Sequence, residues 1–570
     1  MIGSMVGVLV DTSTRPAEWS EQEQRLWEAY RRGEWLDLSE EDDDPEQGDQ
    51  WDAHRTIRDV VIEQLLLHGP EPYPGYTPRL RLHGARITGH LDLSDSRITT
   101  SITLTSCSFE QPVNLSGAEL NTLNLAGSHL PGIEATQAYI ARNLMLRHVT
   151  TTGELRLLGV RIGGQLALSN ARLTHPGQTV LLLDRATIEG GLFLQDVVTA
   201  GEVRLLGAHI GGHLDLSGAR LTNPGRTALN LDGAAVGGNL LATNLLTTGE
   251  TRLPGVRVSG DLALTGAWLT NQDGTALNLD RAAVEGNLFA NDGFTATGEV
   301  RLFSARIGGQ LALNGAQLTN PGGNALHLAE AQATRLVLVL RPNSTGLVNL
   351  RDARVGRFTD DPRLWPPGCQ VDLDGFSYER LSRLPSDTSE PCPIEDRLAW
   401  MQRFATTTQL PGTAEKSRAE FSPTPYEQLA AALHRDGQER QARLVSRERE
   451  RLHHRSRGVL STVWGAIQRW TIGYGYQPVL ALAWVLGVLT AGTLYFATAG
   501  PLTPIKDDEH PTWDPFLYTL DLLVPVLDLG HEKAWDPVGA DKWAALLLMA
   551  AGWVLVTSFV AGASRVLRRP

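Results

Sequence analysis

The sequence has little cysteine and no recognisable secretion signal. Its 570 residues include three cysteines, Cys107, Cys369 and Cys392, and no CxxC pair. This scarcity excludes a disulfide framework and a cysteine-based zinc site, and it is typical of a reducing compartment. The N-terminus MIGSMVGVLVDTSTRP has no basic n-region. We therefore expect no signal peptide and a largely cytosolic chain.

Motifs of catalysis and cofactor binding are also missing from the sequence. It contains no Walker loop, no GxGxxG after a predicted strand, no GxSxG and no HExxH, and His531 and Glu532 are not followed by a second histidine. The glycine doublets at 163–164, 211–212 and 308–309 follow a repeat and precede no predicted helix, which indicates corners and not phosphate loops. We predict a non-enzymatic protein without a cofactor or a metal ion.

Lysine is rare, and the acidic charge is uneven. The chain has 4 lysines against 47 arginines and a formal net charge of −13. Residues 79–354 nevertheless hold 22 arginines and 21 acidic residues, so this region is close to neutral. A nearly neutral rod is a poor mimic of DNA, and the arginine bias is typical of high-GC bacterial genomes. We predict no nucleic-acid partner.

One unit occurs four times: GELRLLGVRIGG from Gly153, GEVRLLGAHIGG from Gly201, GETRLPGVRVSG from Gly249 and GEVRLFSARIGG from Gly298. The starts lie 48, 48 and 49 residues apart. A fixed period of this size predicts a solenoid, in which each unit buries its apolar side against the next. The alternation within residues 213–221 predicts which side chains point inward and which point outward. The inward set is Leu214, Leu216, Ala219 and Leu221, and the outward set is Asp215, Ser217 and Arg220.

The GARL and GAQL segments resemble the A(D/N)Lxx units of the pentapeptide-repeat family. The resemblance implies a mainly β fold, a right-handed quadrilateral parallel β-helix; a three-sided β-helix is the alternative. TNPG-type insertions, such as residues 222–227 and 319–323, lengthen every second turn. We expect a β-helix domain over residues 79–385, in which the repeats from Leu80 to about Val355 form about 11 or 12 turns with a length of about 55 Å. The inserted loops should form one ridge, either a partner surface or a set of tolerated insertions. The Glu-x-Arg pairs are expected to be exposed and to set register and solubility.

Helical segments flank the repeats. We predict a helical N-terminal cap over residues 1–78, a linker over 386–420, and a helical hairpin with an interfacial helix over 421–477. Pro425 is expected in the first turn of the hairpin and Gly437 at its bend. The apolar faces of the two cap helices are expected to contain Leu26, Trp27, Tyr30, Ile57, Val60, Val61, Leu65 and Leu66.

Residues 478–570 read as a two-span membrane module. The uncharged runs 479–499 and 543–564 are each long enough to cross a bilayer as a helix. Arginines precede the first run and follow the second, so both termini and the repeat domain are expected to be cytoplasmic, in a multi-pass inner-membrane protein with loop 500–542 outside. An aromatic belt is expected at Trp464, Trp470, Tyr474 and Tyr476.

The external loop contains a short apolar segment, residues 513–535, whose length favours a re-entrant or an interfacial helix. The tract TIGYGYQP at 471–478 resembles the GYGxxP stretch before ion-channel-like modules fused to bacterial pentapeptide-repeat proteins. The resemblance implies an oligomeric pore. Asp521 and Asp528 are seven residues apart in this apolar segment and could share one helical face, which makes them the candidate ion path. This chain has PVLDLGHE in place of a TVGYG-type filter, which leaves potassium selectivity without a basis.

Two functional hypotheses remain. The first is a membrane-anchored cytosolic β-helix that acts as a scaffold for an unknown cytosolic protein partner. The alternative is a homo-oligomeric ion pore gated by the repeat domain, with 513–535 as its pore segment.

Overall fold

The computed structural model describes residues 18–40, 44–382, 392–404, 421–456, 478–505, 512–524 and 529–567. The chain forms two compact units, Met1–Glu415 and Lys416–Pro570. The first unit holds the repeats, and the second holds the C-terminal helices.

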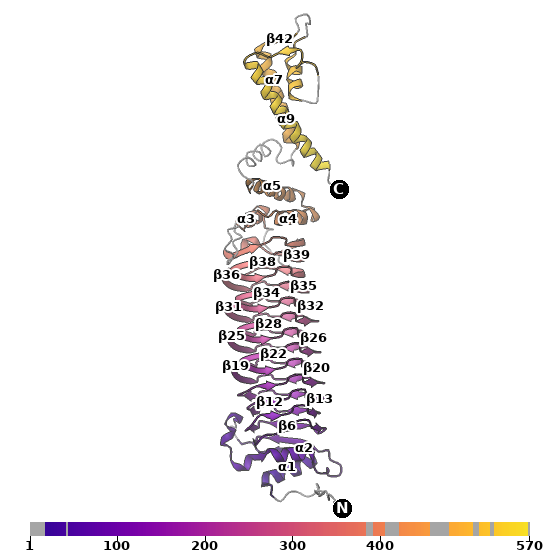
Figure 1. The fold of residues 1–570 in the computed structure, drawn as a ribbon, viewed down its shortest axis with the longest axis vertical. Coiled ribbons are helices and arrows are strands. Elements are labelled where there is room, and N and C mark those ends of the chain that lie inside the picture. Colours follow the sequence, from indigo (N-terminus) through magenta and orange to yellow (C-terminus); the bar gives the residue numbers. More distant parts are fainter. Residues whose placement is uncertain are drawn as a thin grey trace, which may run out of the picture. The chain divides into compact units, whose positions relative to one another are not determined.

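The first unit contains a parallel β-solenoid of about 13 turns (Figure 1). Its strands run from β3 (Leu80–His83) to β41 (Ser377–Ser382), and each described pairing within it is parallel. The prediction of a mainly β solenoid is confirmed. The predicted 11 or 12 turns were too few, because the early turns are short and the strands continue to Ser382. Ile102 pairs with Leu123, and Leu123 with Leu144, at steps of only 21 residues.

The turns alternate in length, as the insertions predicted. Leu166 pairs with Leu192, 26 residues later, and Leu192 pairs with Leu214, 22 residues later. The extra residues lie in four 11-residue strands, which follow one edge of the solenoid in Figure 1. These are β19 (Arg172–Leu182), β25 (Arg220–Asn230), β31 (Trp268–Asn278) and β36 (Gln317–His327). The 48-residue period is therefore one long and one short turn.

The core consists of stacked aliphatic columns. Leu214, Leu216, Ala219 and Leu221 are all at most 1% exposed, whereas Arg220 is exposed. The predicted inward and outward positions are confirmed for this segment. Because each turn buries the apolar side of its neighbour, the stability of the solenoid comes from stacking and not from any single turn.

Two helices and two short strands cap the first turn. Helix α1 (Glu21–Arg32) begins with a capping box between Ser20 and Glu23. Strand β1 (Leu36–Asp37) pairs with β3, and β2 (Thr56–Arg58) pairs with β4 (Arg86–Thr88). These pairings cover an edge that would otherwise offer free backbone groups to another chain.

The predicted apolar faces of the cap are largely buried. Leu26, Trp27 and Tyr30 are at most 4% exposed, but Val60 is 51% exposed. Its predicted burial was wrong because helix α2 (Asp59–Leu67) begins only at Asp59 and buries the face that contains Val61 and Leu65.

The stretch predicted as a linker, 386–420, contains a packed helix. Helix α3 (Ile394–Phe404) places the Trp400 ring 5.2 Å from the Trp365 ring. Arg397 Nη2 lies 2.7 Å from Asp360 Oδ1, and the Asp360 side chain is 1% exposed. This buried ion pair makes α3 part of the end of the solenoid, which corrects the linker prediction for these residues.

The second unit begins with a helical hairpin, as predicted. Helix α4 (Thr424–Arg435) has Pro425 in its first turn, and helix α5 (Glu439–Ser456) follows a bend at Gly437, whose φ is +73°. Arg449 Nη1 on α5 lies 2.9 Å from Glu427 Oε1 on α4. The predicted aromatic belt at Trp464, Trp470, Tyr474 and Tyr476 lies outside the described residues.

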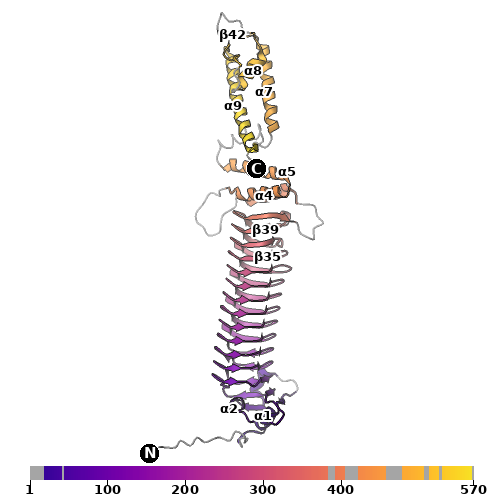
Figure 2. The same ribbon diagram turned by 90° about the vertical axis from the view of Figure 1, so that its right-hand side faces the viewer.

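Three further helices pack together in the second unit. The short helix α8 (Pro515–Leu523) contacts both α7 (Pro478–Ala499) and α9 (Ala540–Leu567), as Figure 2 shows. A Cβ atom on Gly492 of α7 would lie 2.5 Å from Thr519 Cγ2, and one on Gly552 of α9 would lie 2.0 Å from the Leu523 carbonyl oxygen. Glycines in both long helices thus allow α8 to approach closely.

In the part of the chain that the structure describes, no helix combines the length and the apolar character needed to cross a membrane. The predicted spans 479–499 and 543–564 are therefore without support there. The side chains of residues 478–483 and 557–567 lie outside the described set.

Candidate interaction surface

Four loops project from the same position in alternate turns of the solenoid: residues 174–179, 222–227, 270–275 and 319–324. A side chain at the second position of each loop bonds the carbonyl oxygen four residues on, while most of the loop tip stays exposed. The pairs are Asn223–Thr227 (2.7 Å), Asn271–Thr275 (2.9 Å), Asn320–Asn324 (2.7 Å) and His175–Thr179 (3.1 Å). This internal bond closes each loop and fixes its shape.

Each loop packs against a glycine of the next, shorter turn. Gly249 has a φ of +119°, and a Cβ atom there would lie 2.5 Å from the backbone carbonyl oxygen of Asn223 and 2.7 Å from that of Arg226. Gly298 has a φ of +115° and lies equally close to the backbone of the next loop. Only glycine accommodates both the backbone angle and the contact. This explains the first glycine of the Gly-Glu-x-Arg units that begin at Gly201, Gly249 and Gly298. Gly153, which begins the first unit, faces the Pro131 carbonyl oxygen and no loop of the ridge.

The loops are aligned along the solenoid. Thr174, Ala200, Thr222, Thr248 and Thr270 are successive Cα partners at the point where the strands enter or pass the loops. In addition, Arg226 Nη1 donates to the Gly177 carbonyl oxygen at 3.3 Å and joins two loops. The predicted alignment is confirmed, and we call residues 174–179, 222–227, 270–275 and 319–324 the loop ridge.

An exposed apolar strip runs beside the loop ridge. Val198, Leu246 and Trp268 are 44%, 38% and 55% exposed. Arg220 stands between Val198 and Leu246 in the column, and Leu246 and Trp268 are direct Cα partners in adjacent turns. We call these four residues the Trp268 strip. An exposed leucine and tryptophan side by side on an outward-facing sheet need an explanation that a single exposed apolar residue would not.

Sequence reasoning missed this strip, although the repeats contain the signal. The segments ARLTHPG, ARLTNPG, AWLTNQD and AQLTNPG place Arg172, Arg220, Trp268 and Gln317 at one position. Three of these residues are polar, and the remaining one is Trp268. Comparing outward positions across the repeats, and not only inward ones, would have identified it.

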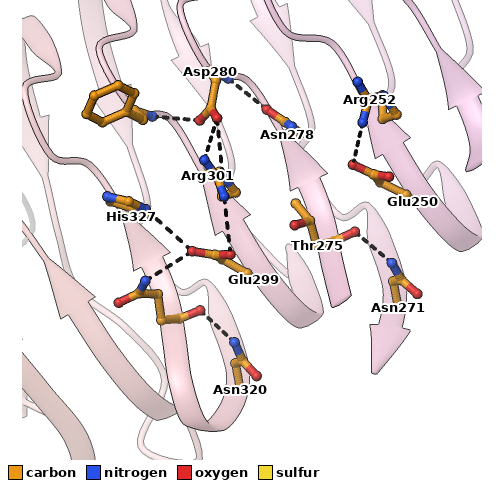
Figure 3. Close-up of polar contacts among 12 residues, drawn as sticks. Glu250, Arg252, Asn271, Thr275, Asn278, Asp280, Glu299, Arg301, Asn320 and His327 are labelled. Carbon is orange, nitrogen blue, oxygen red and sulfur yellow. Dashed lines mark hydrogen bonds and ion pairs between the residues drawn. The ribbon is translucent and has the colours of Figure 1, made fainter. Parts of the chain in front are cut away.

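The strands that leave the loops carry a network of charges between turns (Figure 3). Asp280 Oδ2 accepts from Arg301 Nη2 at 2.7 Å, and its Oδ1 accepts from the backbone N–H of Phe303 at 3.0 Å. Asp184 and Arg204 repeat the arrangement four turns away, and Asp184 is only 7% exposed. Three of the four Glu-x-Arg arginines, Arg204, Arg252 and Arg301, therefore pair with an aspartate of the neighbouring turn, and Arg156 pairs with Glu134 there. These partly buried pairs hold adjacent turns in register, and their bonds to backbone N–H groups make them more than exposed surface pairs.

Two equivalent glutamates of this network titrate in opposite directions. Burial raises the pKa of Glu250, against the attraction of Arg252. Burial acts in the same sense on Glu299, but His327, whose Nδ1 lies 3.5 Å from Glu299 Oε1, and a hydrogen bond from Asn324 Nδ2 outweigh it and lower the pKa of Glu299. Figure 3 shows His327 beside the Glu299 carboxylate. Polar neighbours in the next turn thus decide which state of the glutamate is favoured.

Asp521, a candidate residue of the ion path, has a defined structural role in the second unit. It is 4% exposed, and its Oδ1 accepts from the Leu529 N–H at 2.8 Å and its Oδ2 from the Glu532 N–H at 2.9 Å. Both carboxylate oxygens therefore hold the segment that follows α8. The other candidate, Asp528, lies outside the described residues. The geometry favours Asp521 as a cap of this loop.

The described residues contain no group of three or more histidine, cysteine, aspartate or glutamate side chains that could hold a metal ion. Among the three cysteines, Cys107 and Cys369 are buried and Cys392 is partly exposed. The structure thus defines the chain as a β-solenoid repeat protein with a helical C-terminal unit. No family model matches the sequence, and searches of curated proteins and of solved structures return no match either.

Proposed function

We propose that this chain is a non-enzymatic platform that binds a cytosolic protein through the loop ridge and the Trp268 strip. The observation that carries the proposal is the contact pair Leu246–Trp268, which is exposed on adjacent turns beside loops of fixed shape. Tryptophan and arginine are the residue types that most often dominate protein interfaces, and the strip contains both.

The dimensions of the surface suit a protein partner. The four loops recur every second turn, so they extend over about 29 Å at the usual strand spacing of about 4.8 Å. A standard interface buries about 800 Å² on each partner, which a surface of this length can supply. The hydrogen-bonded loops also limit the conformational entropy that binding would cost.

We further propose that the second unit attaches the platform to a lipid bilayer, on its cytoplasmic face. The support is the uncharged sequence of residues 479–499 and 543–564 together with apolar side chains that point outward from α7 and α9. Leu486, Leu494 and Leu547 are 55%, 62% and 71% exposed. Such a surface is unusual for a helix in water. Fractionation of cells tests the attachment: the full chain should remain with membranes after washing in high salt, and recovery in the soluble fraction would contradict it.

The platform is tested with Trp268→Arg, which introduces the residue that Arg220 already provides at the same repeat position. The matched control is Tyr139→Arg, an aromatic that is 46% exposed and has Arg161 as its partner in the next turn. In-cell crosslinking should identify one major partner. Trp268→Arg should weaken the binding of that purified partner about tenfold or more, and the control should not. A partner whose affinity both variants change equally, or no crosslinked partner at all, would contradict the proposal.

A further inference from the structure

One outward column of the solenoid changes its chemistry in the last three turns. In the middle turns it consists of polar side chains that accept a hydrogen bond from the backbone of the following turn. Asn239 Oδ1 accepts from the Asp261 N–H at 3.0 Å, Asp261 Oδ1 from the Asn287 N–H at 2.7 Å, and Asn287 Oδ1 from the Gln310 N–H at 2.9 Å. After Gln310 the same column holds only arginine.

The arginines are Arg335, Arg357 and Arg380, which are successive Cα partners. They lie on β37 (Gln332–Val337), β39 (Arg354–Thr359) and β41 (Ser377–Ser382), which continue the sheet from β35 (Arg306–Ala312). Figure 2 labels β35 and β39 at this end of the solenoid. Neighbouring turns are about 4.8 Å apart, so the three positions form a row about 10 Å long. Like charges directly opposite one another on a sheet are destabilising.

The rest of the solenoid avoids such rows. Arg204 and Arg301 each pair with an aspartate of the adjacent turn. In contrast, no carboxylate of a described residue lies within 4.0 Å of Arg335, Arg357 or Arg380. The strands β37, β39 and β41 contain four arginines and one glutamate. This end of the sheet therefore has an excess of positive charge that no carboxylate of the described residues neutralises through an ion pair.

We propose that Arg335, Arg357 and Arg380 bind a row of phosphate groups on one ligand, either a free linear polyphosphate or the headgroups of anionic phospholipids. The guanidinium group is planar and binds phosphate through two parallel hydrogen bonds, which makes arginine the residue suited to such a ligand. A sheet holds the three side chains at fixed intervals. A ligand with several phosphates is needed, because a single phosphate cannot reach the whole row.

The first experiment titrates the full-length chain in mild detergent with sodium tripolyphosphate by calorimetry. The test variant is Arg335→Gln/Arg357→Gln/Arg380→Gln, which restores the residue type of Gln310 in the same column. The matched control is Arg161→Gln/Arg257→Gln/Arg306→Gln, which removes the same charge from a neighbouring column whose arginines are not on adjacent turns; Ala283, for example, separates the last two. A thermal midpoint at or above that of the wild type shows that the test variant is folded.

The wild type should bind tripolyphosphate, and more weakly when salt rises from about 50 to 200 mM because the contacts are screened. The test variant should lose about a hundredfold in affinity, since charged hydrogen bonds at three sites disappear, and the control should change less than about threefold. The proposal fails if the wild type does not bind, if both variants lose the same affinity, or if polyglutamate binds as tightly as tripolyphosphate.

A second titration distinguishes the two sources of phosphate. Short-chain phosphatidylglycerol, kept below its micellar concentration, is added with tripolyphosphate already bound, and short-chain phosphatidylcholine serves as its control. Displacement by phosphatidylglycerol alone assigns the site to anionic headgroups. Tripolyphosphate that stays bound assigns it to a free polyphosphate. Displacement by both lipids equally would overturn recognition of phosphate charge.

Discussion

Replacing Gly249 with alanine should disrupt the solenoid locally, because this glycine permits the loop ridge. Its φ of +119° is one that residues with a side chain rarely adopt. The new Cβ atom would lie 2.5 Å from the backbone carbonyl oxygen of Asn223 and 2.7 Å from that of Arg226. The backbone angle alone costs about 1–3 kcal/mol, and forcing the loop base aside costs about another 1–3 kcal/mol. We expect a total of about 4 kcal/mol.

The matched control is Gly255→Ala, six residues along the chain. Gly255 has a φ of +66°, and its Cβ atom would have no neighbour within 4 Å. Its replacement should therefore cost only the free energy of holding alanine in the left-handed backbone conformation, about 1–2 kcal/mol. The difference between the two variants isolates the contact with the loop from the conformational preference of glycine.

Hydrogen exchange measured by mass spectrometry is the suitable assay, because a long repeat array does not unfold in a single two-state transition. The peptides to follow cover β25 (Arg220–Asn230) and β28 (Leu246–Arg252). A loss of about 4 kcal/mol increases local opening roughly a thousandfold, and one of about 1–2 kcal/mol about five- to thirtyfold. If the two variants accelerate exchange in these peptides equally, the glycine is not needed to make room for the loop, and the reasoning is refuted.

Three further predictions concern ionisable groups. At pH 7, Glu250→Gln should raise the thermal midpoint and Glu299→Gln should lower it, because folding disfavours the ionised form of a carboxyl whose pKa is raised and favours that of one whose pKa is lowered. The stabilisation by Glu299 should fade as the pH falls through its lowered pKa, and the destabilisation by Glu250 should fade as the pH falls through its raised pKa. Shifts of the thermal midpoint in the same direction for both variants would contradict this. Cys392 should react with iodoacetamide long before Cys107, because Cys107 is fully buried and burial raises its pKa to about 12. Mass spectrometry of partially labelled protein checks this order, and equal labelling of the two cysteines in the folded chain would contradict it. Asp521→Asn should destabilise the segment after α8 by about 1–3 kcal/mol, because an amide has one acceptor oxygen in place of two charged ones; faster exchange in residues 529–535 is expected, and unchanged exchange would remove the proposed capping role.

The solenoid could be predicted because its determinants are local and repeated. The inward positions alternate with period two, and the spacing of Gly153, Gly201, Gly249 and Gly298 reports the period directly. The number of turns could not be counted as well, since the early turns lack insertions and are only 21 residues long. A single average turn length hides that difference.

Contacts between turns were harder to predict. Ion pairs within the Glu-x-Arg motif do form, as between Arg156 and Glu154. The motif did not indicate that Arg204 and Arg301 would pair with aspartates of the neighbouring turn. Which side chains meet across turns depends on register, and an insertion of about four residues shifts the register by an amount that the sequence alone does not specify. The role of Asp521 was hidden for a related reason, because its partners are the backbone N–H groups of Leu529 and Glu532.

The outer face of a solenoid is informative because the inner face is so constrained. Every inward position must fit the turns above and below it, so its residue type reports packing and little else. Outward positions are less constrained by packing, and the equivalent positions of the other turns show which residue type is usual at each of them. Trp268 departs from the arginine found at Arg172 and Arg220, and Arg335 begins a row where asparagine and glutamine precede it. Exposing a tryptophan and stacking like charges both disfavour the isolated protein. Two unfavourable departures in an otherwise regular surface are most simply explained by ligands that compensate for them: a protein at the Trp268 strip and a phosphate-bearing molecule at the arginine row.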